Sequence, residues 1–237
     1  MNIHSGLQDP AAAAGEQIER MLLARQNVKI LLLLSGGSSF DVLEHVHDGL
    51  GGNVTVSMID DRYSEDKEVN NFSQLLHNDF TKRCTNSGCY IFGTHVNVRE
   101  TMAEHEQRYE KMLKDWIETN PEGKVIALMG IGADGHTAGI LPFPESKKVF
   151  DNLFEQDGDF ATAYDAKEKS EHSLRMTVTN DFLREQVDYA VIYAVGEDKR
   201  KALEDTLTES GEVHITPARV IRQMKDVELF TDLTVSY

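Results

Sequence analysis

Short, continuously apolar stretches alternate along this chain with longer amphipathic ones, and the first three of them end in loops rich in glycine, serine or aspartate. Strands that are apolar on both faces are typical of parallel sheets covered by helices on each side. Residues 28–34, 54–59, 124–129 and 187–195 have this character. The alternation therefore predicts an α/β fold with a doubly wound, mostly parallel sheet and helices on both faces.

The remaining segments predict the other helices and four shorter strands. Two prolines, Pro142 and Pro144, exclude a long helix directly after the glycine-rich loop that precedes them. Because no repeat, low-complexity tract or Pro-, Gly- or Ser-rich linker divides the chain, residues 1–237 are expected to form one domain. The expected helices cover residues 11–26, 40–50, 71–83, 99–119 and 198–209, and the expected short strands cover 90–96, 162–164, 174–179 and 227–230.

The composition restricts what such a domain binds. Hydrophobic residues make up 40% of the chain and charged residues 27%, which allows a sizeable core, and the formal net charge is −16. A surface this acidic repels nucleic acid and anionic lipid, so neither is an expected partner. An anion site on this chain needs its own local group of Arg, Lys or backbone N–H groups.

The sequence also lacks targeting and metal-binding patterns. The first residues do not show the basic-then-apolar order of a signal peptide, and the longest apolar run is too short to span a bilayer, so we expect a cytoplasmic protein. The spacing of Cys84 and Cys89 allows a small local disulfide, but reduced thiols are the expected state. Without a nearby pair of histidines the two cysteines do not form a zinc-site pattern. No metal is expected.

Ligands of open α/β sheets bind beyond the carboxyl ends of the strands. The first loop at such an end runs from Ser35 to Ser39 with the sequence SGGSS. Gly36 and Gly37 let the backbone turn tightly and approach a ligand, Ser38 and Ser39 supply hydroxyl donors, and the following helix N-terminus presents free N–H groups. The loop fits a phosphate, although a plain strand–helix turn with a serine cap has the same residues.

The second loop contains Asp60, Asp61 and Arg62. Its carboxylates are candidates to accept hydrogen bonds from sugar hydroxyl groups, and Arg62 is a candidate to hold developing negative charge. Taken alone, these residues equally fit a surface turn with a local ion pair. Two later cations, Arg175 in a predicted strand and Lys199 at a predicted helix start, are further candidates for an anion site, because a cation at a helix start is otherwise unfavourable.

The third loop carries Gly130, Gly132 and Gly135, the G-x-G-x-x-G spacing of dinucleotide-binding loops. That fingerprint requires a helix directly after the loop, which the two prolines exclude, so no NAD and no other organic cofactor is expected. His136 follows the last glycine, and a histidine supplies a neutral base near pH 7. Asp134, two residues away, is placed to orient or polarise it, although many histidines in proteins are structural.

Six motifs in series resemble the 6-phosphogluconolactonases, which form a larger group with glucosamine-6-phosphate deaminases and ribose-5-phosphate isomerases. They follow the family's order between about residues 30 and 222: SGGSS, DDR, GIGADGHTAGILP, LRMTVT, VGEDKRKAL and ITPARVI. The resemblance implies a doubly wound domain like that of the sugar-phosphate isomerases. It also implies hydrolysis of 6-phospho-D-glucono-1,5-lactone to 6-phosphogluconate in the oxidative pentose phosphate pathway, without metal or cofactor.

The same resemblance implies roles for individual residues. His136 corresponds to the general base that activates water, Asp134 to the carboxylate beside it, and Arg62 to the arginine of the family's Asp-Glu-Arg loop. The SGGSS loop, Arg175 and Lys199 correspond to the groups that hold the substrate phosphate. The departures concern fine specificity: Ser39-Phe40 replaces Thr-Pro, Asp61 replaces Glu, Tyr63-Ser64 replaces Val-Pro, and Asn70-Asn71 matches a Ser-Asn pair only loosely.

Two alternatives compete with the lactonase interpretation. An amino-sugar phosphate deaminase or isomerase would use a carboxylate such as Asp60 as its base, but the deaminases carry a working Glu where this chain has Leu141. A non-catalytic sugar-phosphate sensor would keep the phosphate loop and would not need His136. A hydrolysis assay with the lactone distinguishes all three.

Overall fold

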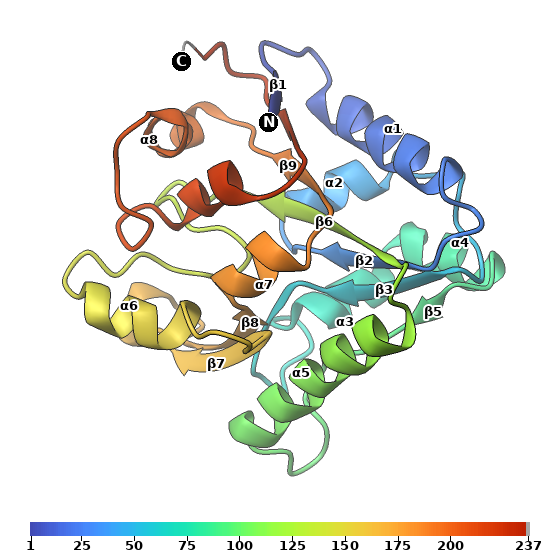
Figure 1. Ribbon diagram of the computed structural model, residues 1–237, viewed down its shortest axis with the longest axis horizontal. Helices are drawn as coiled ribbons and strands as arrows, with labels where there is room; N and C mark the ends of the chain where they lie inside the picture. The colour runs from blue at the N-terminus through green and yellow to red at the C-terminus, as the bar shows by residue number, and fades with distance from the viewer. Residues whose placement is uncertain (236–237) are drawn as a thin grey trace.

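Seven parallel strands form the main sheet of the computed structural model, which describes residues 1–235 (Figure 1). Across the sheet their order is β1-β10-β9-β6-β2-β3-β5, and each neighbouring pair is parallel. The predicted α/β class with a mostly parallel sheet is thereby confirmed. The strands are β1 (Asn2–His4), β2 (Ile30–Leu34), β3 (Val54–Met58), β5 (Tyr90–Ile91), β6 (Lys124–Gly130), β9 (Tyr189–Tyr193) and β10 (Val227–Phe230).

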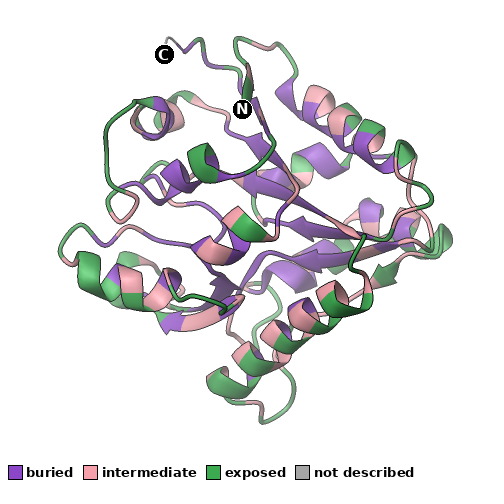
Figure 2. Cartoon of the chain, viewed as in Figure 1, coloured by how far each residue is buried: buried purple, intermediate pink, exposed green. Residues whose placement is uncertain are grey.

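Helices cover both faces of this sheet because its central strands are apolar on both sides. In β2, Leu31 and Leu33 belong to one buried cluster, whereas Ile30, Leu32 and Leu34 belong to the other. Figure 2 shows these central strands as a buried layer behind helices with exposed outer faces. The helices are α1 (Pro10–Leu23), α2 (Ser39–Leu43), α3 (Asn71–His77), α4 (Asp79–Asn86), α5 (Met102–Thr119), α6 (Lys147–Phe154), α7 (Asn180–Glu185) and α8 (Arg200–Leu207), with 3₁₀ turns η1 (Lys167–Lys169), η2 (Glu197–Lys199) and η3 (Pro217–Gln223).

A second, three-stranded antiparallel sheet begins where β3 ends. Ile59 joins the two sheets, because its N–H donates to the carbonyl of Leu34 (2.8 Å) and its own carbonyl accepts from the N–H of Val178 (3.3 Å). The residue after it starts the second sheet, which is therefore fixed beside the carboxyl end of β2. The strands of this sheet are β4 (Asp60–Arg62), β8 (Leu174–Val178) and β7 (Ala161–Asp165), in that order.

The helix predicted over residues 40–50 is much shorter in the structure and ends at Leu43. Further along, the backbone N–H groups of His47 and Asp48 donate to the Glu19 carboxylate of α1, at 2.5 and 2.8 Å. Because these two N–H groups bond Glu19, they cannot donate to the backbone carbonyls that a continuing helix would offer. The helix predicted over residues 40–50 was therefore wrong in its second half.

The helix predicted over residues 71–83 is divided into α3 and α4. Asn78 is extended, with ψ 143°, and its side chain caps α4 by accepting from the N–H of Phe80. The strand predicted over 90–96 ends at Ile91, and the segment Asp60–Arg62, predicted as a loop, is strand β4. The short elements β1, α6 and α7 were not predicted.

The structure of residues 1–235 also tests the expectations about the two cysteines and about membrane-spanning helices. Cys84 and Cys89 are free thiols, as expected. No helix in this part of the chain combines the length and the apolar character that a membrane crossing requires.

Candidate active site

A cavity of about 250 Å³ opens where the two sheets meet, at the loops that follow β2, β3 and β6. These three strands are neighbours in the main sheet, in the order β6-β2-β3, so the loops at their carboxyl ends lie together. Two of the candidate residues, Asp61 and Asp134, do not line the cavity. The predicted site residues that do line it are Gly36, Gly37, Ser38, Ser39, Asp60, Arg62, His136, Arg175 and Lys199.

The loop after β2 offers unused backbone donors to this cavity. Within the described residues, the N–H groups of Gly36, Gly37 and Ser38 donate to no acceptor. Gly37 has φ +65°, a left-handed conformation that residues with a side chain rarely adopt. Because α2 has only five residues, its dipole is small, and the N–H and hydroxyl groups of the loop itself are what an anion would contact.

Three cations line the cavity without an acidic partner. Arg62 on β4 lies directly opposite Arg175 on β8, and the Nζ atom of Lys199 lies 3.4 Å from the Oγ atom of Ser38. Within residues 1–235, none of the three cations forms an ion pair. Burial lowers the pKa of Lys199 against the opposing charge of nearby aspartates. Unpaired cations that converge on one cavity make it a candidate anion site.

His136 is held by Asp134. The Nδ1 atom of the ring lies 2.5 Å from Oδ1 of Asp134, and the backbone N–H of His136 donates to the same oxygen at 3.1 Å. Burial raises the pKa of Asp134, but the hydrogen bond and charge of His136 outweigh it and bring the pKa below its ordinary value. An ionised Asp134 favours the tautomer with a proton on Nδ1, which leaves Nε2 as an acceptor.

One glycine of residues 130–136, Gly132, leaves the space that His136 occupies. A Cβ atom on Gly132 would lie 2.1 Å from the Nδ1 atom of His136, so the imidazole occupies the space that a side chain would need. Gly135 has φ +83° and its N–H donates to the carbonyl of Gly132. The next helix begins at Lys147, in agreement with the two prolines. The G-x-G-x-x-G spacing therefore occurs here without the helix that a dinucleotide site requires directly after it.

A tight turn follows His136. Ala138 (φ 46°) and Gly139 (φ 71°) are both left-handed, and the N–H of Ile140 donates to the carbonyl of Thr137 at 2.8 Å, the pattern of a type I′ turn. A Cβ atom on Gly139 would lie 2.6 Å from the Cβ atom of Asp60. The turn therefore brings the backbone after His136 against the first residue of β4.

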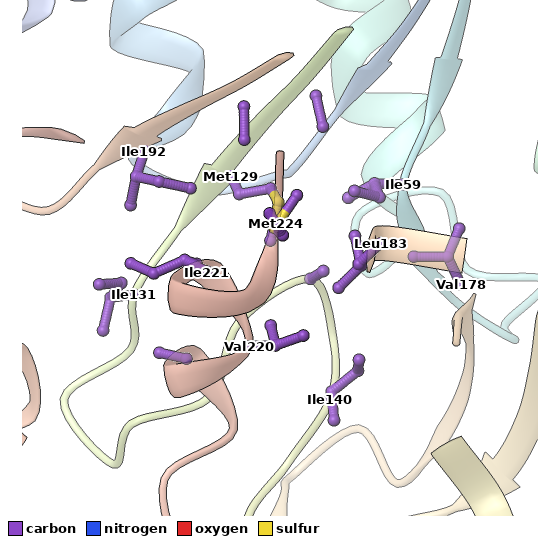
Figure 3. Close-up of a cluster of buried hydrophobic side chains, with 14 of the residues drawn as sticks. Ile59, Met129, Ile131, Ile140, Val178, Leu183, Ile192, Val220, Ile221 and Met224 are labelled. Atoms are coloured by element: carbon purple, nitrogen blue, oxygen red, sulfur yellow. The ribbon is translucent and has the colours of Figure 1, made fainter. Parts of the chain in front are cut away.

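Apolar side chains fix this loop to the rest of the fold. Ile131 and Ile140, on either side of His136, belong to the same buried cluster as Val220 and Ile221 of η3. Figure 3 shows these side chains gathered between the loop and η3. The loop is thus anchored at both ends, which limits movement of the imidazole.

The two aspartates of β4 have different surroundings. Asp60 lines the cavity, whereas the Asp61 carboxylate accepts from the N–H groups of Asn71 and Phe72 and from the hydroxyl of Thr94. Burial raises the pKa of Asp61 to about 7, and its hydrogen bonds oppose that rise. Of the two carboxylates that were candidates for contact with a sugar, only Asp60 faces the cavity.

Several residues of the cavity wall were not predicted. Asn71 is the most informative, because the sequence presented Asn70-Asn71 only as a loose match to a family motif; their position at the start of the helix after Asp60–Arg62 was the available signal. Within residues 1–235 no group of three or more His, Cys, Asp or Glu is placed to hold a metal ion. The lining residues outside the three predicted loops are Asn71, Ala138 and Gly139, whereas Ser35, Gly130, Ile131 and Gly132 lie within those loops but were not among the individual site residues.

Residues 6–230 match the family described as glucosamine-6-phosphate isomerases/6-phosphogluconolactonase. The chain belongs to this family. The resemblance drawn from six sequence motifs is thereby confirmed, and this glucosamine-6-phosphate isomerase/6-phosphogluconolactonase family places the chain in carbohydrate metabolism. No curated protein matches the chain.

Solved structures of this family share the fold over nearly the whole chain. The 6-phosphogluconolactonase from Thermotoga maritima has a TM-score of 0.76 at 19% identity, over 97% of this chain and 98% of its own. That from Trypanosoma brucei has a TM-score of 0.74 at 18% identity, and that from Leishmania guyanensis 0.71 at 22%, each over 97% of this chain and 95% of its own. Such identities establish the fold, and the family membership indicates an enzyme.

Proposed function

We propose that this chain hydrolyses 6-phospho-D-glucono-1,5-lactone to 6-phosphogluconate. The observation that carries the proposal is the presence in one cavity of a histidine held by a carboxylate and of three cations that have no acidic partner within residues 1–235. A phosphorylated sugar lactone requires both features, a base at its C1 carbonyl and an anion site at its far end. Family membership and the names of the structural neighbours support the same substrate.

The anion site would hold the phosphate. Its groups are the free N–H and hydroxyl groups of the SGGSS loop, the ammonium of Lys199 and the guanidinium of Arg175. Binding at the far end fixes the lactone carbonyl relative to the base and lowers the entropic barrier to attack. Asp60 would accept a hydrogen bond from a sugar hydroxyl group.

The reaction would begin at His136. Its Nε2 atom takes a proton from water as the water oxygen attacks C1, and the tetrahedral oxyanion is stabilised by Arg62. The bond between C1 and the ring oxygen then breaks, and His136 returns the proton to that oxygen. Asp134 keeps the imidazole oriented and stabilises its charged form.

The structure also bears on the deaminase alternative. Leu141 takes the place of the deaminase glutamate in the sequence, and it is buried in the main apolar cluster. A leucine there moves no proton, and the cluster around it is apolar.

Initial rates with the lactone and with glucosamine 6-phosphate test the proposal. We expect lactone hydrolysis well above the spontaneous rate and no release of ammonia from the amino sugar. Binding of 6-phosphogluconate without any acceleration of lactone opening would instead identify a sensor, and ammonia release would identify a deaminase.

A further inference from the structure

Asn71, the first residue of α3, joins two parts of the cavity wall. Its Nδ2 group donates to the backbone carbonyl of Asp60 at 3.2 Å and lies 3.5 Å from the Oδ2 atom of Asp60. Its own backbone N–H donates to the Asp61 carboxylate at 2.6 Å. Asn71 is only 2% exposed, so the side chain is held in one place between β4 and the loop after β2.

The other side of Asn71 lies against Gly36 in the SGGSS loop. A Cβ atom on Gly36 would lie 2.4 Å from the Oδ1 atom of Asn71 and 2.5 Å from its Cγ atom. Gly36 does not have a left-handed φ, so what requires glycine here is space and not backbone conformation. The Oδ1 atom is buried and accepts no hydrogen bond within the described residues, so its contact with Gly36 is one of close packing.

We propose that Asn71 is a positioning residue of the proposed lactonase site, on which this inference rests. Its Nδ2 group keeps the Asp60 carboxylate turned toward the cavity. Its Oδ1 face sets the path of the loop at Gly36, and hence the position of the N–H groups that receive the phosphate. One side chain thereby fixes the sugar-contacting carboxylate relative to the anion site.

The contact between Asn71 and Gly36 is tested by a double-mutant cycle with Gly36→Ala, Asn71→Ala and the double variant. Asn71→Ala keeps the backbone N–H that bonds Asp61 and places a good helix former at the start of α3, so the variant is expected to fold. In titrations with inorganic phosphate, Gly36→Ala should weaken binding by about tenfold or more in the natural chain, but by less than about threefold beside Asn71→Ala. Thermal unfolding, which needs no ligand, should show the same non-additivity.

The contact between Asn71 and Asp60 is tested by kinetics. In Asn71→Ala and in the double variant, kcat for the lactone should fall about tenfold or more below that of the natural chain, because Asp60 has lost its hydrogen-bond donor. Asn70→Ala is the matched control, since Asn70 is equally buried and caps α3 without lining the cavity. Its cycle with Gly36→Ala should be additive.

These measurements test the positioning role of Asn71 separately from the proposed lactonase activity. Additive effects of Gly36→Ala and Asn71→Ala in both phosphate binding and unfolding, or an unchanged kcat in Asn71→Ala, would overturn the positioning role. A natural chain that hydrolyses no lactone would remove the proposed function, and the unfolding cycle would still show whether Asn71 sets the path of the loop.

Discussion

Arg62 and Arg175 are direct cross-strand partners on β4 and β8, and the Nε atoms of both are buried without a hydrogen-bond partner in residues 1–235. Like charges opposite each other destabilise an antiparallel pair. A bound anion removes this repulsion, so inorganic phosphate should raise the melting temperature. At a hundred times its dissociation constant the gain should be about 2.7 kcal/mol, and chloride at equal ionic strength is the control.

Substitution of Arg175 separates two effects of the facing arginines: repulsion in the ligand-free protein and binding of phosphate. Arg175→Met should stabilise the ligand-free protein by about 0.5 kcal/mol, because it removes the like-charge pair, and should weaken phosphate binding by more than about tenfold. Arg184→Met is the matched control: Arg184 pairs with Glu155 and Asp181, so its loss should destabilise the fold without changing phosphate affinity. Lower stability with unchanged affinity in Arg175→Met would contradict the anion site.

His136→Ala should lower the catalysed rate by about 10²- to 10⁴-fold, the usual effect of losing an acid–base group. Affinity for 6-phosphogluconate should change little, because the phosphate is held elsewhere. Initial rates at mildly acidic pH, where spontaneous opening of the lactone is slow, provide the measurement. A variant that retains more than about half of the activity would exclude His136 as the base.

Ala138 carries backbone strain beside the imidazole. A left-handed φ costs an alanine about 1–2 kcal/mol, which exceeds the usual penalty for introducing a glycine. Ala138→Gly should therefore stabilise the fold by about 0.5 kcal/mol. Ala12→Gly, within helix α1, should destabilise it by about 1 kcal/mol. Denaturant unfolding of the two variants checks the difference, and equal losses in both would show that the turn at Ala138 is unstrained.

His105 on α5 should make the fold acid-sensitive. Burial and the nearby charge of Arg108 lower its pKa to about 4, although Glu100 opposes the shift. In the window between the ordinary value of 6.5 and about 4 the unfolded chain binds the extra proton, so stability falls as the pH falls, by about 3 kcal/mol in all. Urea unfolding of His105→Leu should show a weaker pH dependence in this window; an unchanged slope would assign the effect to other groups.

The central strands were predictable because each one is a short run of consecutive apolar residues, which by itself indicates burial on both faces. Residues 124–129 read as a strand in isolation and form most of β6. Strand β4, in contrast, exists because Asp60, Asp61 and Arg62 pair with residues more than a hundred positions later in β8. No local pattern in three charged residues specifies such a partner, so the sequence alone predicts a loop at this position.

The contacts of the candidate site were also predictable only in part. Asp134 and His136 are two residues apart, so their contact was expected from spacing and is present at 2.5 Å. The contact of Asn71 with Gly36 depends on how α3 meets the loop after β2, which spacing does not reveal. Contacts within one loop were accessible from the sequence, and contacts between loops required the fold.

One edge of the main sheet joins two segments that lie far apart in the sequence, with consequences for how the chain folds. Edge strand β1 pairs through Asn2, Ile3 and His4 with β10, the last strand within residues 1–235. Loop-closure entropy opposes this pairing, because nearly the whole chain lies between the partners. Because β1 precedes β10 in the chain, a ribosome releases β1 long before its partner strand exists. During synthesis this edge of the main sheet therefore stays unpaired until β10 has been made.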